Sequence, residues 1–140
     1  MTSLLNRLIA KAARHLYLRR HQKAWGEEPQ LAVSVSNLCV ELEGRQVRLR
    51  MYHGQSDKPM VIYAHGGGFV IGSLETHDRF CRALSVKSGC SLVSIDYRLA
   101  PEYTFPAAHD DCLEATEWVI ENLENLAPNN GLFVLAGDRA

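Results

Sequence analysis

The sequence of 140 residues lacks any apolar run close to the about 18 residues that a membrane-spanning helix needs. It also lacks internal repeats, low-complexity tracts and an excess of one charge, since its formal net charge is -1. These absences exclude a membrane span and a nucleic-acid-coating protein, so no nucleic-acid partner is expected. A hydrophobic content of 46% with 22% charged residues is typical of a globular domain with a single core.

The cysteines are few and carry no metal-binding pattern. The four of them form no C-x-x-C pair, and the six histidines do not stand at ligand spacing from them. We therefore expect no metal and no cofactor. Because a secretory signal pattern is missing as well, buried free thiols in a reducing, cytoplasmic compartment are predicted, with a disulfide between Cys81 and Cys90 as the alternative.

The first 25 residues contain six Lys or Arg residues and no acidic residue. A basic amphipathic helix of this kind suits a mitochondrial-type presequence or a membrane-surface helix. The interpretation that we favour is a helix whose apolar stripe packs on the rest of the protein. Its apolar residues recur at helical spacing, at Leu4, Leu5, Leu8, Ile9, Ala12, Ala13 and Leu16.

Beyond this helix the apolar pattern becomes extended. Residues 32–42 and 46–53 alternate around a Glu43-Gly44-Arg45 turn, which predicts an antiparallel hairpin. The next strands are predicted from runs that are apolar on both faces, as in a parallel sheet covered by helices on both sides. These runs are residues 60–64, 91–95 and 132–136.

Two helical patterns separate these three runs. One covers residues 77–88, with Thr76 as N-cap and Gly89 as stop, and the other covers residues 110–126. Strand, helix, strand, helix and strand in alternation predict an α/β fold with a mostly parallel sheet, preceded by the antiparallel strand pair.

The segment HGGGFVIG, residues 65–72, places three glycines directly after the first parallel strand, at the end where α/β sheets bind ligands. Glycine permits positive φ and a close approach to the main chain, so its N–H groups can converge on an anion. A phosphate loop would require a G-K-[ST] or G-x-G-x-x-G register, and Phe69, Val70 and Ile71 provide neither. The oxyanion of an attacked carbonyl is therefore favoured, and a phosphate-binding module remains the alternative.

Four segments occur in a characteristic order: HGGGFVIG, THDRFCRAL, SIDYRLAPEYTFPAAHDD and LFVLAGD. In this order and spacing the chain resembles the hormone-sensitive-lipase group of α/β-hydrolase esterases over about residues 33–140. The resemblance implies a cap-type helix in residues 1–28 and the N-terminal half of an α/β-hydrolase domain in residues 29–140. It also implies hydrolysis of short-chain acyl esters by a Ser-Asp-His mechanism.

Within this resemblance the oxyanion hole lies in His65, Gly66, Gly67 and Gly68. The N–H groups of Gly67 and Gly68 would point at the carbonyl oxygen of a bound ester as it becomes tetrahedral. His65 would act as a scaffold whose ring hydrogen-bonds the loop, not as the catalytic base.

The DYRLAPE segment and the acidic pair after it are expected to be structural. Arg98 and Glu102 are close enough in sequence to pair across the turn at Pro101. Asp110 and Asp111 favour the start of the second helix electrostatically and are not expected to act as general acids.

The chain departs from the family pattern at the nucleophile turn. The family has G-D-S-A-G there, whereas this sequence reads Gly137-Asp138-Arg139-Ala140. Arg139 takes the place of the serine and cannot attack a carbonyl because it stays protonated, while the N–H of Ala140 would be the third oxyanion donor.

The acid and the histidine of the triad follow the serine in this fold, so we expect the chain to lack nucleophile, acid and base and to be inactive alone. The last strand, residues 132–136, would become a sheet edge that favours a homo-oligomer or pairing with a missing C-terminal half. The alternative function is therefore that of a non-catalytic fragment or a partner-binding pseudoenzyme.

Overall fold

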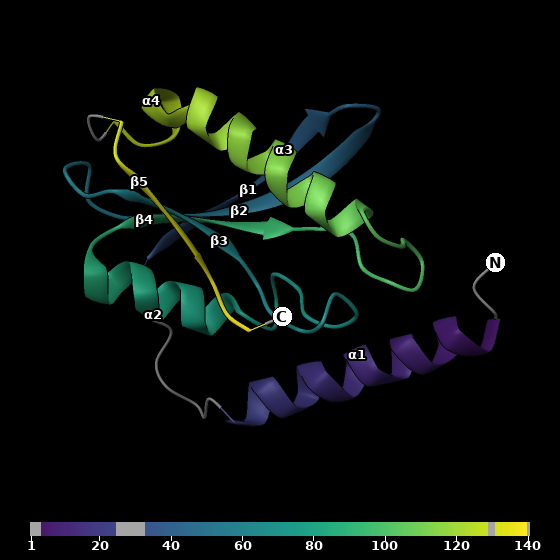
Figure 1. Ribbon diagram of the computed structural model, residues 1–140. Helices are drawn as coiled ribbons and strands as arrows, with labels where there is room; N and C mark the ends of the chain where they lie inside the picture. The colour runs from purple at the N-terminus through teal and green to yellow at the C-terminus, as the bar shows by residue number, and fades with distance from the viewer. Residues whose placement is uncertain (1–3, 25–32, 129–130, 140) are drawn as a thin grey trace.

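The structure of the protein, a computed structural model, describes residues 4–24, 33–128 and 131–139 (Figure 1). A central sheet carries α2 on one face and α3 on the other, and α1 lies beside the α2 side. The elements, in chain order, are α1 (Leu4–Ala24), β1 (Ser34–Leu42), β2 (Arg45–His53), β3 (Met60–Ala64), α2 (Asp78–Ser88), β4 (Ser91–Asp96), α3 (Ala107–Glu121), α4 (Leu123–Leu126) and β5 (Phe133–Gly137).

The sheet has five strands in the order β1-β2-β4-β3-β5. β1 and β2 form the predicted antiparallel hairpin, which turns at Gly44 with φ of 71°. β2 then pairs antiparallel with β4, and β3 is parallel to both β4 and β5. The predicted α/β architecture, with a mostly parallel sheet and an antiparallel strand pair before it, is therefore confirmed.

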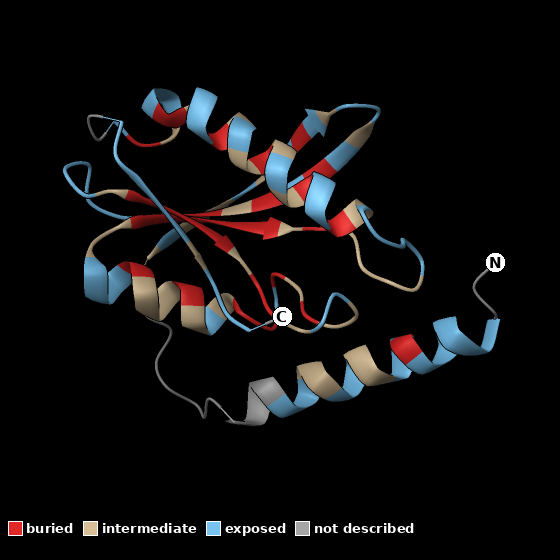
Figure 2. Ribbon diagram, in the orientation of Figure 1, coloured by how far each residue is buried: buried red, intermediate tan, exposed pale blue. Residues whose placement is uncertain are grey.

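Side chains of the inner strands alternate between two hydrophobic layers, because successive residues of a strand point to opposite faces. In β3, Met60 and Ile62 pack in the layer under α3, whereas Val61 and Tyr63 pack in the layer over α2. This explains why the run 60–64 is apolar at every position. Figure 2 shows the buried residues concentrated in these strands and on the facing sides of the two helices.

The helix boundaries differ from the predicted ones at the starts of both helices and at the end of the second. α2 begins at Asp78, and the N-cap position belongs to His77, so the prediction of Thr76 as N-cap is wrong. Gly89 stops α2 as predicted, in the left-handed conformation with φ of 75°. α3 begins at Ala107, earlier than predicted, with Pro106 at its N-cap, and ends at Glu121, so the single helix predicted over residues 110–126 is divided into α3 and α4.

The four thiols are free. Cys81 is buried, as predicted, and Cys90 and Cys112 are half-buried, but Cys39 lies on the edge strand β1 and is exposed. The predicted burial is therefore wrong for Cys39. Cys81 and Cys90 form no disulfide.

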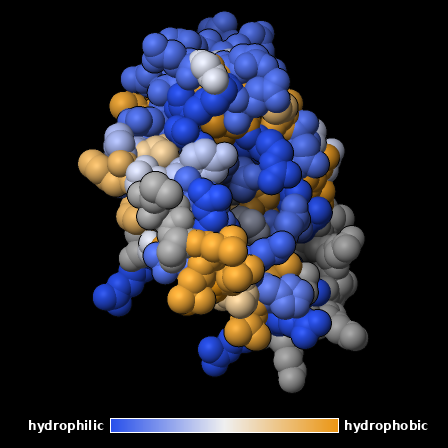
Figure 3. All heavy atoms as spheres, turned by 90° about the vertical axis from the view of Figure 1, so that its right-hand side faces the viewer, coloured by the Kyte–Doolittle hydropathy of each residue, from blue (hydrophilic) through white to orange (hydrophobic). Residues whose placement is uncertain are grey.

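In the part of the chain that the structure describes, α1 leaves most of its predicted apolar stripe exposed, and only Leu8 and Ala12 of the stripe line the groove toward the domain, so the predicted packing of the stripe is wrong for the other large side chains. Figure 3 shows hydrophobic atoms gathered low on the molecule, at the level of α1 in Figure 1. Instead, the helix buries Ala10 and docks through Arg14, whose guanidinium donates to the main-chain oxygens of Val70 and Ala100 over 2.8 and 2.7 Å. The exposed side chains of the stripe are Leu4, Leu5, Leu8, Ile9 and Leu16.

No helix in the described part of the chain is long and apolar enough to cross a bilayer. The predicted boundary between residues 28 and 29 lies outside the described residues.

Candidate functional site

The glycine loop leaves β3 and turns directly against the end of β5. Ala64, the last residue of β3, is paired with Gly137, the last residue of β5. A Cβ atom on Gly66 would lie 2.2 Å from the main-chain oxygen of Arg139. Only glycine fits at this position, since any side chain would overlap the backbone that follows β5.

The next two residues require glycine for conformational reasons. Gly67 has φ of 130° and Gly68 has φ of 60°, which L side chains rarely adopt. The oxygen of Gly67 accepts the N–H groups of Val70 and Ile71 over 3.2 and 3.0 Å, which closes the loop into a tight turn. A Cβ atom on Gly68 would meet nothing within 4 Å, so the loop is open to solvent there.

The N–H groups of the three glycines differ in their partners. The N–H of Gly66 donates to Asp138 Oδ1 over 2.6 Å. Among the contacts of the described residues, the N–H groups of Gly67 and Gly68 donate to no acceptor. Two consecutive unpaired N–H groups, with open space at the second glycine, can bind an anion or a partly negative carbonyl oxygen.

Asp138 anchors the loop, a role that the sequence analysis missed. Its carboxylate accepts hydrogen bonds from the N–H of Gly66 and the hydroxyl of Tyr63, and its Oδ2 lies 3.2 Å from His77 Nε2. Burial tends to raise the pKa of Asp138, but these three donors outweigh it and hold that pKa below its usual value. The sequence signal for this role was the position of Asp138 directly after the predicted strand 132–136, since the carboxyl end of that strand was expected beside the glycine loop.

His65 supports the glycine loop through hydrogen bonds of its ring and main chain. Its Nδ1 donates to the oxygen of Gly66 over 2.9 Å, and Tyr97 donates its hydroxyl to the main-chain oxygen of His65. The His65 and Tyr97 rings stack with centroids 4.3 Å apart. Burial lowers the pKa of His65, so that the ring is held neutral. Its Nε2 is buried with no hydrogen-bond partner among the described residues.

The DYRLAPE segment is held by pairs other than the predicted one. Arg98 pairs with Asp111 over 2.8 Å, and Glu102 pairs with Arg14 of α1 over 2.7 Å, so the expected pairing of Arg98 with Glu102 is wrong. Asp111 is fully buried and also accepts from Arg45 over 2.6 Å. Local spacing could not reveal these partners, because they come from β2, α1 and α3.

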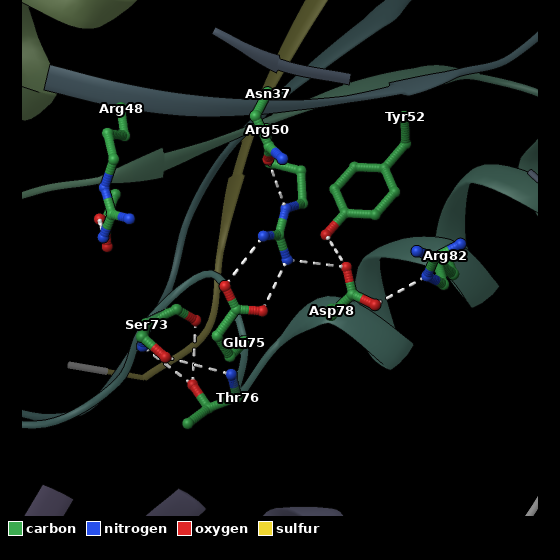
Figure 4. Close-up of polar contacts among 10 residues, drawn as sticks. Asn37, Arg48, Arg50, Tyr52, Ser73, Glu75, Thr76, Asp78 and Arg82 are labelled. Carbon is green, nitrogen blue, oxygen red and sulfur yellow. Dashed lines mark hydrogen bonds and ion pairs between the residues drawn. The ribbon is translucent and has the colours of Figure 1, made fainter. Parts of the chain in front are cut away.

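The segment after the glycine loop is fixed by a polar network on its other side (Figure 4). Arg50 of β2 donates to Asn37 over 2.9 Å, to Glu75 over 2.9 Å and to Asp78 over 3.1 Å. Tyr52 adds a hydrogen bond to Asp78 over 2.8 Å. These contacts join the start of α2 to the sheet, so the loop is held between two rigid elements.

α1 and the segment after the glycine loop enclose an open groove of about 590 Å³. Tyr17 of α1 lies near enough to Asp138 that burial, and then the charge of Asp138, raise the pKa of its hydroxyl. Gly72, at the end of the segment 65–72, is among the residues that line the groove. The groove is lined by Leu8, Lys11, Ala12, Arg14, His15, Leu18, Gly72, Ser73 and Thr76.

The remaining predicted site residues are Arg139 and Ala140. Arg139 is exposed and follows β5 at the edge of the glycine loop, while Ala140 lies outside the described residues. No group of three or more His, Cys, Asp or Glu residues in the described part of the chain could hold a metal ion.

Comparison with known proteins gives consistent matches. The sequence pattern of the alpha/beta hydrolase fold matches residues 61–140. Esterase LipI of Mycobacterium tuberculosis is 48% identical over 86 residues, which are 61% of this chain and 27% of that protein. Ethyl acetate hydrolase of Pseudomonas putida is 37% identical over 101 residues, which are 69% of this chain and 32% of that protein.

Solved structures extend the similarity to the fold. The hyperthermophilic esterase from the archaeon Pyrobaculum calidifontis superimposes with a TM-score of 0.82 at 40% identity. That superposition covers 92% of this chain and 42% of the archaeal chain. This chain thus spans less than a third of the length of the two curated relatives and less than half of the solved esterase.

Proposed function

Because the chain belongs to the alpha/beta hydrolase fold family, we propose that its glycine loop is the oxyanion-binding element of a carboxylic ester hydrolase of the hormone-sensitive-lipase group. The observation that carries the proposal is the pair of unpaired N–H groups on Gly67 and Gly68, with open space at Gly68. Such donors stabilise the charge that develops when an ester carbonyl becomes tetrahedral, and each one contributes about 3 kcal/mol.

Short-chain acyl esters are the proposed substrate class, cleaved in the complete site by a Ser-Asp-His mechanism. One similar protein is an ethyl acetate hydrolase, which supports a small acyl group. In the proposed pose the ester carbonyl oxygen accepts from Gly67 and Gly68, while Asp138 and His65 hold the loop in place.

Arg139 takes the proposed position of the nucleophile. A guanidinium stays protonated and cannot attack a carbonyl, so we propose that this chain binds an ester or its anionic analogue without cleaving it. With the chain as written, p-nitrophenyl acetate should be hydrolysed at the buffer rate. Turnover well above that rate, lost in the Gly67→Ala variant, would contradict this part of the proposal.

The binding step is tested by amide NMR with methylphosphonate, a tetrahedral anion that resembles the attacked ester. We expect saturable downfield shifts of the Gly67 and Gly68 amide protons. Gly44 is the matched control, because it also has positive φ and open space around it. Shifts that are absent, or equal at Gly44, would overturn the oxyanion-binding proposal.

A second candidate function is non-catalytic binding of a partner through β5, and the exposure of that strand favours it. In the described part of the chain β5 pairs with β3 alone, and Val134 and Leu135 are 49% and 63% exposed. An open edge offers N–H and C=O groups to another strand, either of a second copy or of the C-terminal half of a hydrolase. Sedimentation velocity that gives a monomer at all concentrations would exclude the second copy as partner.

The chain organisation and the compartment are proposed on the same basis. Residues 1–28 are proposed as a cap-type element over the site, and residues 29–140 as the hydrolase-type portion. Free thiols at all four cysteines suit a reducing compartment, and the cytoplasm is proposed.

A further inference from the structure

Arg14 of α1 binds two segments that lie far from it in the chain. Its guanidinium donates to the main-chain oxygens of Val70 and Ala100, and it forms a bidentate ion pair with the carboxylate of Glu102 over 2.9 and 2.7 Å. Such a pair fixes the plane and the direction of a guanidinium. The hydrogen bonds of Arg14 also hold the pKa of Glu102 below its usual value, so the carboxylate stays charged and keeps Arg14 in place.

The contact with Val70 reaches the glycine loop through two peptide groups. The Nε–H of Arg14 donates to the oxygen of Val70 over 2.8 Å. That oxygen belongs to the same planar peptide group as the N–H of Ile71, which donates to the oxygen of Gly67 over 3.0 Å. The oxygen of Gly67 in turn shares its peptide group with the N–H of Gly68. A row of two hydrogen-bonded peptide groups therefore joins Arg14 to one of the two amides of the proposed oxyanion site.

This row of peptide groups is polarised in one direction. A peptide group whose oxygen accepts a hydrogen bond from a cation becomes a stronger N–H donor, and hydrogen-bonded groups in a row strengthen one another. The cation of Arg14 stands at the oxygen end of the row, and the N–H of Gly68 stands at the opposite end. The row therefore fixes the direction of the Gly68 N–H and also makes it a better donor to a negatively charged oxygen.

The backbone between the two peptide groups needs such a restraint. Phe69 has φ of 59°, in the left-handed region that a bulky side chain rarely adopts. A strained conformation of this kind persists where the surrounding contacts impose it. Two contacts do so here: the N–H of Ala100 donates to the oxygen of Phe69 over 2.8 Å, and Arg14 holds the oxygen of the next residue, Val70. The shape of the loop therefore depends on groups that lie outside it.

We propose that Arg14 is a positioning residue of the oxyanion site, a role that rests on the function proposed above for the glycine loop. Arg14 acts through the loop and not on the ester itself. It orients the N–H of Gly68 through the two peptide groups and strengthens that N–H as a donor. Without the guanidinium the domain should still fold, but the loop should close less firmly and bind an oxyanion more weakly.

The test is amide NMR of the full chain with Arg14→Met, which keeps an apolar stem but removes the guanidinium. We expect methylphosphonate to bind about tenfold more weakly, as measured by the shift of the Gly68 amide, because a hydrogen bond from a charged donor is lost. Hydrogen exchange at the Ile71 amide should become about tenfold faster, while the amide of Ile62 in the buried strand β3 should keep its rate. Arg14→Lys keeps a cation that can donate to Val70, so its results should lie between those of Arg14→Met and the unaltered chain.

Arg20→Met is the matched control, because Arg20 is an exposed arginine of the same helix. It should leave the Ile71 exchange and the methylphosphonate affinity unchanged, and circular dichroism should give the same helix content for all variants. Equal results in Arg14→Met and Arg20→Met would overturn the proposal. Faster exchange at Ile71 and Ile62 together would overturn it as well, because Arg14 would then stabilise the whole fold and not the loop in particular.

Failure of the proposed function would give a different result. Methylphosphonate would then shift neither the Gly67 nor the Gly68 amide in the unaltered chain, whereas the exchange at Ile71 would still respond to Arg14→Met. The link from Arg14 to the loop fails when the Ile71 exchange does not respond, whatever the ligand does.

Discussion

The carboxylate of Asp138 accepts the N–H of Gly66 over 2.6 Å, which joins two segments that lie 72 positions apart in the chain. This bond uses the first amide of the glycine loop, so only the next two amides remain available to a ligand. It also brings the loop within contact of the backbone after β5. The site therefore depends on the pairing of β3 with β5 as much as on the glycines.

Alanine at the loop glycines should separate steric from conformational requirements. We expect Gly66→Ala to lower the free energy of unfolding by about 2–4 kcal/mol, because its Cβ would lie 2.2 Å from the oxygen of Arg139. Gly68→Ala should cost only about 1 kcal/mol, for the left-handed backbone. Urea unfolding measures both. Equal losses in the two variants would contradict the packing of Gly66 against the end of β5.

Removing the buried carboxylate of Asp111 should be far more harmful than removing its neighbour. Asp111→Ala leaves Arg98 and Arg45 without their buried partner, and we expect a loss of about 3–5 kcal/mol in the free energy of unfolding. Asp110→Ala is the control, since Asp110 is exposed and contributes at most about 0.5 kcal/mol through the helix dipole. Similar urea midpoints for the two variants would contradict the assigned ion pairs.

Stability should fall as the solution becomes mildly acidic because of His65. Burial lowers the pKa of this ring in the folded state, whereas the unfolded chain has a pKa of about 6.5. The unfolded state therefore takes up the proton first. The contribution of His65 is fully present above about pH 6.5 and is lost as the pH falls through the folded-state pKa.

Urea unfolding at several values between pH 7.5 and 5 measures this effect. His65→Gln should be less stable at pH 7.5 but should show a shallower loss toward pH 5. His109→Gln, at an exposed position, should keep the slope of the unaltered chain. A slope that is unchanged in His65→Gln would assign the acid sensitivity to other groups.

The thiols should react with a disulfide reagent in the order of their exposure. Cys39 is exposed and should be labelled first, whereas Cys81 is fully buried, and burial raises its pKa to about 12. We expect Cys81 to react only as fast as the protein unfolds. In Cys39→Ser the fast phase should disappear, and a fast phase that persists would mean that another thiol is open to solvent.

The sequence by itself determined the element types, the parallel strands and the place of the glycine loop. Runs such as residues 60–64, apolar on both faces, have one stable location, which is between two helical layers. Three consecutive glycines after such a strand likewise have few explanations other than a close approach to the main chain. These are local properties, and local periodicity is sufficient to read them.

Only the tertiary structure decided which charges pair and which face of α1 is buried. Arg98 pairs with Asp111 and not with Glu102, and Glu102 pairs with Arg14. Folding brings these partners together from different elements, so their spacing in the sequence does not reveal the pairs. Most of the apolar stripe of α1 is exposed, whereas Ala10 is buried and Arg14 docks the helix through its hydrogen bonds to Val70 and Ala100. Periodicity defines the two sides of a helix, but the contacts made after folding determine which of them meets the protein.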